Sequence, residues 1–150
     1  NVELKLKHIL DIRDFEESQY SKYMTKNFDD ILSDDVVDIV VETMGGVNPA
    51  DDFTKKLLLA GKQVITSNKE LVATHGPELL AIAKEKNANF LFEASVGGGI
   101  PIIHPIHQCL TANEITEIFG KCGAFAHDVR NHCLIQKLSY LIKLHVFFLL

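Results

Sequence analysis

Cysteine and positive charge are both in short supply in this sequence. Its three cysteines are odd in number and follow no paired spacing, which argues against a secreted disulfide framework and favours a reducing compartment, the cytoplasm. Fifteen basic residues face twenty acidic ones, and the formal charge of -5 argues against a nucleic acid or an anionic membrane as the main partner. Apart from histidine, the longest stretch without a formal charge is 94–113. It holds three consecutive glycines and two prolines, so no membrane span is expected.

The two ends of the chain also lack familiar features. Residues 1–7 include neither an initiator Met nor the apolar core of a signal peptide, and we expect the sequence to begin part-way into a domain. Residues 1–120 carry 11 basic and 19 acidic side chains, net -8, whereas residues 121–150 carry 4 basic and 1 acidic, net +3. We therefore treat residues 121–150 as a separate segment. Its Leu134, Leu138, Leu141 and Leu144 lie at helical spacing and predict an amphipathic helix.

Alternating strands and helices are predicted for the first 120 residues. With 150 residues and a hydrophobic content of 47%, the chain can bury a core without disulfides or a structural metal. Five strands are expected, at residues 4–12, 36–41, 63–66, 90–93 and 114–119. Helices are expected at 28–32, at 48–61 with Asn48 as N-cap, from Lys69 with Asn68 as N-cap to a break at Gly76-Pro77, from there to Lys86, and from Pro101. This order predicts an α/β fold with a mostly parallel sheet covered on both faces.

In such sheets ligands bind beyond the carboxyl ends of the strands, which draws attention to four short segments. The first is 42–46, where Thr43 offers a hydroxyl and two glycines let the backbone approach a flat ligand, although a plain strand-to-helix turn is the favoured explanation for two glycines alone. The second is 66–69. A lysine in the first turn of a helix is poorly matched to the helix dipole, so Lys69 either meets a ligand anion or reacting oxygen, or simply points to water.

The other two strand-end segments carry carboxylates. Glu93 precedes a glycine-rich loop whose carbonyls could join it around a hard cation, the alternatives being an anion nest or a turn without ligand. Asp11 could accept from a ribose hydroxyl while Arg13 meets a 2'-phosphate, or both are ordinary surface charges. The scattered Cys and His residues after His104 follow no zinc spacing, and a metal site is not expected there.

Four segments in this order resemble homoserine dehydrogenases: V-D-I-V-V-E-T-M-G-G at 37–46, A-G-K-Q-V-I-T-S-N-K at 60–69, F-E-A-S-V-G-G-G-I-P-I-I at 92–103 and L-T-A-N-E-I at 110–115. The resemblance extends over residues 2–120. It implies an NAD(P)-dependent oxidoreductase that interconverts L-aspartate 4-semialdehyde and L-homoserine in threonine and methionine biosynthesis. It also implies a Rossmann-like cofactor domain and, for the complete enzyme, a homodimer.

The resemblance also implies residue roles. Lys69 matches the family lysine assigned to cofactor binding and proton transfer, and Thr43 matches a position lining the nicotinamide nucleotide. Glu93 matches a sodium ligand, together with the backbone carbonyls of Val96, Gly98 and Ile100. The implied domains are a truncated NAD(P)-binding domain at 1–103, the start of a substrate and dimerisation domain at 104–120, and a tail at 121–150 unlike the family.

The family begins with a strand and a G-x-G-x-x-G turn that this sequence does not contain, so we expect the chain alone to be inactive. The sequence leaves two alternative functions. A phospho-receiver module would use acidic pairs such as Asp34-Asp35 with Thr66 and Lys69, but receivers need an aspartate at a central strand end where this chain has Glu42. A noncatalytic cofactor-binding or oligomerisation remnant is the other alternative, and an activity assay separates it from an enzyme.

Overall fold

Two parallel sheets organise the part of the chain that the structure, a computed structural model, describes: residues 3–14, 17–110 and 112. The strands are β1 (Ile9–Leu10), β2 (Met24–Thr25), β3 (Ile39–Glu42), β4 (Gln63–Thr66) and β5 (Phe90–Leu91). The helices are a 3-10 turn (Ser21–Tyr23), α1 (Asp29–Leu32), α2 (Ala50–Leu59), α3 (Lys69–Glu85), α4 (Glu93–Gly97) and α5 (Ile103–Cys109). The alternation of the two element types confirms the predicted α/β class.

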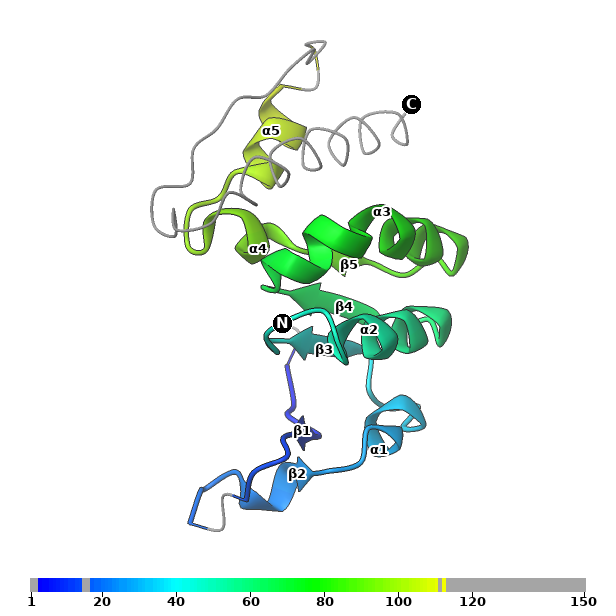
Figure 1. The fold of residues 1–150 in the computed structure, drawn as a ribbon, viewed down its shortest axis with the longest axis vertical. Helices are drawn as coiled ribbons and strands as arrows, with labels where there is room; N and C mark the ends of the chain where they lie inside the picture. Colours follow the sequence, from blue (N-terminus) through cyan, green and yellow to red (C-terminus); the bar gives the residue numbers. More distant parts are fainter. Residues whose placement is uncertain (1–2, 15–16, 111, 113–150) are drawn as a thin grey trace.

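The larger sheet has the order β3-β4-β5, and β1 pairs with β2 in a separate small sheet. Figure 1 shows the β1–β2 pair below β3, with α1 on the way back up to it. The predicted strand 4–12 is largely wrong, because only two of its residues pair with a neighbour and Leu4 remains 81% exposed. Sequence reasoning missed β2, whose two residues are too few to show a period.

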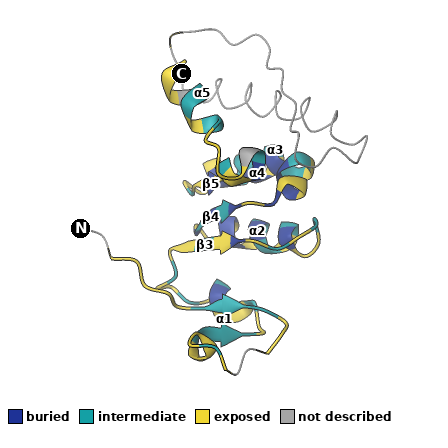
Figure 2. Cartoon of the chain, turned by 90° about the vertical axis from the view of Figure 1, so that its left-hand side faces the viewer, coloured by how far each residue is buried: buried dark blue, intermediate teal, exposed yellow. Residues whose placement is uncertain are grey.

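The core lies between the larger sheet and two helices. Parallel pairing places Val40, Val64 and Phe90 in one row, and this row faces α2 and α3. Figure 2 shows both helices on the same side of the strands. Leu58 in α2 and Leu71 and Leu79 in α3 are completely buried there, and each such leucine stabilises the fold by roughly 1.5–3 kcal/mol. The helices and strands are therefore held by a single apolar layer.

The other face of the larger sheet is apolar and exposed. Val41, Ile65 and Leu91 form its central row across the three strands. Val41 is 62% and Leu91 54% exposed, so the prediction of a sheet covered on both faces is wrong for the described residues. Strand alternation predicted apolar residues on both faces, but it could not say which segments would cover them.

Helix α3 runs without interruption through Pro77, which corrects the predicted break at Gly76-Pro77. Proline removes one backbone hydrogen bond, but the residues on either side keep one apolar face against the core. Leu71 and Val72 lie before the proline, and Leu79 and Ala83 lie after it, all of them buried. The packing of this face therefore outweighs the local cost of the proline.

The other helices differ from prediction in their ends. Helix α2 starts one residue later than expected, with Pro49 rather than Asn48 at the N-cap position and no side-chain capping bond. Helix α5 starts at Ile103, two residues after Pro101. The predicted strand at 114–119 and the predicted helix in the tail lie outside the described residues. Of the predicted segments 104–120 and 121–150, the structure describes α5 and, after it, only residues 110 and 112.

Lys62 fastens the connection between α2 and β4 to the loop before β3. Its side chain is 8% exposed, and its Nζ donates to the carbonyls of Asp34 at 2.8 Å and Val37 at 3.0 Å. Nearby, Phe28 stacks on Phe53 with ring centroids 4.0 Å apart, which joins α1 to α2. No helix in the described part of the chain is both long and apolar enough to cross a lipid bilayer.

Candidate functional site

The carboxyl ends of the strands bring three of the four predicted segments to one edge of the larger sheet. The register pairs Glu42 at the end of β3 with Thr66 at the end of β4. β5 ends at Leu91, and Glu93 follows as the first residue of α4, which packs against β4 and α3. The segments 42–46, 66–69 and 93–100 are therefore neighbours in space, as predicted from the parallel topology.

A buried ring of hydrogen bonds joins the turn after β3 to the turn after β4. Oε1 of Glu42 accepts the Met44 N–H at 2.5 Å, and Oε2 of Glu42 accepts the Thr66 hydroxyl. Thr66 Oγ1 accepts the Asn68 N–H at 2.9 Å, and Asn68 Nδ2 donates to the Gly46 carbonyl at 2.6 Å, which closes the ring. Glu42, Thr66 and Asn68 are 4%, 1% and 6% exposed. We call this set of residues the strand-end ring.

Thr43 lies between two members of the strand-end ring and is exposed at the surface. The turn that carries it is also open: a Cβ placed on Gly45 or Gly46 would meet no other heavy atom within 4 Å. Gly46 has φ of +77°, a left-handed conformation that favours glycine. A flat ring can therefore approach the backbone here, which is what a nicotinamide beside Thr43 requires.

Lys69 is the first residue of α3 and is exposed at the same edge. Asn68 caps the helix as predicted, because its Oδ1 accepts the Leu71 N–H at 3.1 Å. The same side chain belongs to the strand-end ring, so the start of α3 is fixed relative to the turn after β3. Lys69 consequently extends from a rigid helix end rather than from a loop.

Glu93 lies in α4 rather than in the strand and loop that the sequence predicted. Its carboxylate accepts three backbone N–H groups at the start of α5, from Ile102, from Ile103 at 2.8 Å and from His104 at 2.9 Å. Burial alone would raise the pKa of Glu93, but these three N–H groups outweigh it and hold the pKa below the usual 4.5. Glu93 therefore caps α5 as a carboxylate.

The predicted sodium ligands Val96, Gly98 and Ile100 follow Glu93 directly in α4 and the turn after it. Gly98 has φ of +61°, and Ile100 is 67% exposed. The described residues contain no group of three His, Cys, Asp or Glu side chains arranged for a metal, and this absence has no bearing on a site built from backbone carbonyls. The sodium site stays a prediction.

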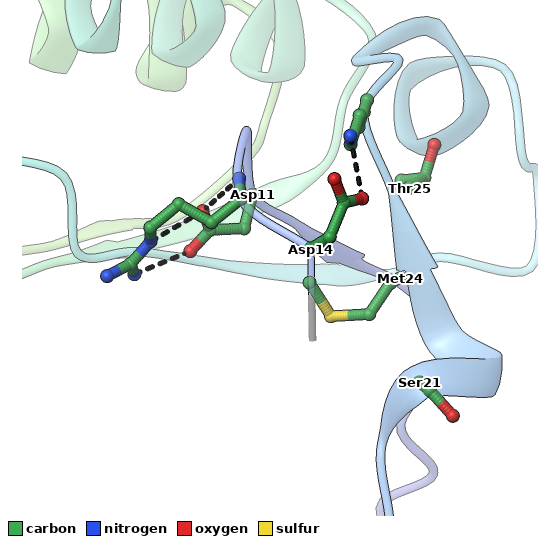
Figure 3. Close-up of a pocket in the computed structure, with 7 residues that line it drawn as sticks. Asp11, Asp14, Ser21, Met24 and Thr25 are labelled. Atoms are coloured by element: carbon green, nitrogen blue, oxygen red, sulfur yellow. Dashed lines mark hydrogen bonds and ion pairs between the residues drawn. The ribbon is translucent and has the colours of Figure 1, made fainter. Parts of the chain in front are cut away.

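Asp11 and Arg13 lie at the carboxyl ends of the smaller sheet and border a cavity of about 190 Å³ (Figure 3). The cavity is lined by Asp11, Arg13, Asp14, Ser21, Met24, Thr25 and Lys26. The guanidinium of Arg13 donates two hydrogen bonds to the carboxylate of Asp11, at 2.8 and 3.0 Å, and these bonds lower the pKa of Asp11 to about 2. The volume of this cavity is below the roughly 300 Å³ of a typical ligand pocket.

The match to known proteins decides the family. A family model described as "Homoserine dehydrogenase, NAD binding domain" matches residues 1–93. The chain belongs to the homoserine dehydrogenase family. Its matched segment is the NAD-binding domain, in agreement with the parallel sheet and with the glycine turn at its edge.

Individual members of the family agree. The homoserine dehydrogenase of Lactococcus lactis is 40% identical over 102 residues, 68% of this chain and 23% of that protein. The Bacillus subtilis enzyme is 36% identical over 117 residues, 78% of this chain and 27% of that protein. The crystal structure of a homoserine dehydrogenase from Thiobacillus denitrificans superposes with a TM-score of 0.58 at 46% identity, over 60% of this chain and 21% of that one. The chain thus spans about a quarter of the length of its curated relatives.

Two buried residues of the site, Glu42 and Thr66, had no role implied by the family resemblance. Both lie inside the matching motifs, but composition and periodicity could not separate them from the exposed residues beside them. A usable signal was present nonetheless. Glu42 and Thr66 each end an apolar strand, where the parallel topology brings polar residues of adjacent strands together.

Proposed function

We propose that this chain forms the nicotinamide side of the active site of a homoserine dehydrogenase. Such an enzyme interconverts L-aspartate 4-semialdehyde and L-homoserine with NAD or NADP, in threonine and methionine biosynthesis and, by family resemblance, as a homodimer. The observation that carries the proposal is the strand-end ring. It joins the open turn of Thr43 and Gly46 to the helix start that carries Lys69.

In this proposal Lys69 donates or accepts the proton of the reaction. A bound nicotinamide would supply the hydride to the aldehyde carbon, or remove it from the alcohol carbon in the reverse direction. Reduction of the aldehyde builds negative charge on its oxygen, and an ammonium at the edge of the sheet stabilises this charge and then donates a proton to it. In the reverse direction the amine of Lys69 accepts the hydroxyl proton. Thr43, exposed on the open turn, lines the nicotinamide nucleotide.

The carboxylate of Glu93 has an acceptor position left for a sodium ion in addition to those it uses as a helix cap. Each carboxylate oxygen has about two acceptor positions. Oε1 uses both on Ile102 and Ile103, whereas Oε2 uses one on His104, so Oε2 is the oxygen left to ligate a cation. The carbonyls of Val96, Gly98 and Ile100 are the remaining ligands of the proposed site. Raised thermal stability in sodium chloride over choline chloride supports this assignment, and equal stability opposes it.

In this proposal the cavity beside Asp11 receives the adenosine ribose of the cofactor. Asp11 offers a carboxylate to the ribose hydroxyls, while Arg13 and Lys26 line the same cavity and can face a 2'-phosphate. The ion pair with Asp11 partly neutralises the guanidinium of Arg13. The net charge of Asp11 and Arg13 therefore sets the preference between NAD and NADP.

Two glycines of equal conformation test the location of the cofactor. Gly46 and Gly61 have φ of +77° and +78°, and neither has a heavy atom within 4 Å of a built Cβ. Gly61, however, precedes β4 at the opposite edge of the sheet. Both changes to alanine place a Cβ at a positive φ, so a loss of cofactor binding in Gly46→Ala that Gly61→Ala does not share assigns the effect to this edge of the sheet, through the cofactor contact or through the Gly46 carbonyl of the strand-end ring.

The test uses a chimera, a complete homoserine dehydrogenase in which residues 3–110 of this chain replace the corresponding segment. Fluorescence titration with NADPH should show that Gly46→Ala weakens binding by about tenfold or more, the usual cost of a misplaced contact in a preformed site. Gly61→Ala should bind as the parent does. Equal affinity of the two variants would contradict the proposed site.

The phospho-receiver alternative has no support from the comparisons or the geometry. At the strand end where a receiver needs an exposed aspartate, Glu42 is 4% exposed and both of its carboxyl oxygens accept hydrogen bonds. Asp34 and Asp35 precede β3, at the opposite edge of the sheet from Thr66. These acidic residues and Thr66 therefore do not form one site.

A further inference from the structure

We propose that Glu42 is a positioning residue, whose buried carboxyl group couples the turn of Thr43 to the helix start of Lys69. The idea rests on the proposed function for its consequence, because coupling matters only if both side chains serve one cofactor. The coupling itself is a property of this chain's own hydrogen bonds. It can be measured without any ligand.

Glu42 is the last residue of β3, and its side chain points toward the helix-covered side, on which Val40 lies two residues earlier. An acidic side chain at 4% exposure needs partners, because an unsatisfied buried carboxyl group is costly. Both of its oxygens have one: Oε1 binds the Met44 N–H on its own turn, and Oε2 binds Thr66 on the next strand.

Thr66 connects the carboxyl group of Glu42 to the start of α3. The Thr66 hydroxyl donates to Glu42, and the same oxygen accepts the Asn68 N–H at 2.9 Å. Asn68 then caps α3 with its Oδ1 and reaches back to the Gly46 carbonyl with its Nδ2. Because the ring is closed, movement of one turn must break or stretch bonds on the other.

The two residues that would contact the cofactor lie outside the strand-end ring. Thr43 and Lys69, the two predicted ligand-contacting residues, are both exposed and lie next to ring members in the sequence. An exposed side chain gains no fixed position from core packing. The ring fixes the backbone from which both side chains extend, and a glutamate is suited to it because one carboxyl group can accept bonds from its own turn and from the next strand at once.

Amide hydrogen exchange of the complete 150-residue chain tests the coupling. In Glu42→Gln, the side-chain amide keeps only one acceptor oxygen, so the link across the ring forms only if the Thr66 hydroxyl reverses and accepts from the amide while it also accepts from Asn68, which weakens the ring. We expect exchange at Met44, and equally at Asn68 and Leu71 across the ring, to rise about tenfold or more through local opening. Val64 is completely buried in β4, and its amide, which donates to the Asn89 carbonyl, reports any general loss of stability.

Variants at two threonines provide a second reading that does not depend on Glu42. Thr66→Val removes the hydroxyl from the ring, and Thr66→Ser restores it. Thr54→Val is the matched control, since Thr54 is also completely buried but its hydroxyl has no hydrogen-bond partner within the described residues. Faster exchange in both turns of Thr66→Val, rescued in Thr66→Ser and absent in Thr54→Val, supports the proposal.

Two results would overturn the positioning role. One is a rise confined to Met44 in Glu42→Gln, and the other is a uniform rise that includes Val64. The functional consequence is read separately in the chimera, where Glu42→Gln should weaken NADPH binding and lower kcat for homoserine together, while Thr54→Val changes neither. If the parent chimera does not bind NADPH, the proposed function fails while the exchange result on the coupling stands. If it binds and Glu42→Gln has unchanged kinetics, the positioning role fails alone.

Discussion

Replacement of Glu93 by glutamine should destabilise the chain in a pH-dependent manner. Glu93 accepts three N–H groups at the start of α5, two of them at 2.8 and 2.9 Å. Glutamine keeps one acceptor oxygen for Ile102 and Ile103 but turns an amide donor toward the His104 N–H. One charge-assisted bond is lost and two become neutral, and since a bond to a charged group contributes roughly 1.5–3 kcal/mol, we expect a loss of about 2 kcal/mol near neutral pH.

The pH dependence follows from the direction of the pKa shift. The three N–H groups hold the pKa of Glu93 below its unfolded value of 4.5 despite the opposing effect of burial. A depressed pKa stabilises the fold above pH 4.5, and this contribution disappears as the pH falls through the folded pKa. Glu93→Gln lacks the ionisable group, so the gap between the two proteins should be widest near neutral pH and should narrow in acid.

Urea unfolding followed by circular dichroism measures this gap at about pH 7 and about pH 3.5. The other carboxylates with lowered pKa values, such as Asp34 and Glu78, titrate in both proteins and cancel in the difference. Exchange of the Ile106 amide, which donates to Ile102 in the first turn of α5, gives a local reading of the cap. A gap of the same size at both pH values, or no gap near neutral pH, would refute the capping role of the carboxylate.

Three further changes test other parts of the structure. Lys62→Met should lower the free energy of unfolding by about 1–3 kcal/mol in urea, because the carbonyls of Asp34 and Val37 lose their ammonium partner, and an unchanged midpoint would count against it. Asp11→Asn in the chimera should shift the ratio of NADPH to NADH affinity roughly fivefold toward NADPH, as the guanidinium of Arg13 loses a neutralising carboxylate, and a shift toward NADH would be inconsistent with the ribose assignment. The 150-residue chain alone should show no homoserine-dependent reduction of NAD or NADP in a spectrophotometric assay, because its sequence holds no G-x-G-x-x-G phosphate turn. Steady turnover that disappears in Lys69→Ala would contradict that expectation.

Local sequence chemistry predicted the elements that depend on near neighbours. Gln63–Thr66 is a strand as expected, and Asn68 caps the helix that starts at Lys69. Both depend on residues within one or two turns of themselves. The break at Gly76-Pro77 was wrong because the deciding contacts of α3 are with α2 and the sheet, far along the chain. Proline chemistry alone could not anticipate them.

The candidate site was predictable as a location but not as a network. Parallel topology sufficed to bring Thr43, Lys69 and Glu93 to one edge, since strand ends share that edge in any such sheet. The ring through Glu42 and Thr66 depends on the register between two strands, and a shift by one residue would turn Thr66 to the opposite face. Glu93 was expected at the end of a strand, because nothing in the local sequence showed that the backbone of Ile102 to His104 would supply its partners.

The turnover of Lys69→Ala in the chimera tests the central claim most directly. A general acid and base contributes about 10²–10⁴-fold, so kcat for homoserine oxidation should fall by roughly 100-fold or more. Lys56→Ala is the control, because Lys56 is an exposed lysine in α2 paired with Asp52 and should leave kcat unchanged. Unchanged kcat in Lys69→Ala, with the parent chimera active, would remove Lys69 from the mechanism and contradict the assignment of this edge of the sheet as the active site.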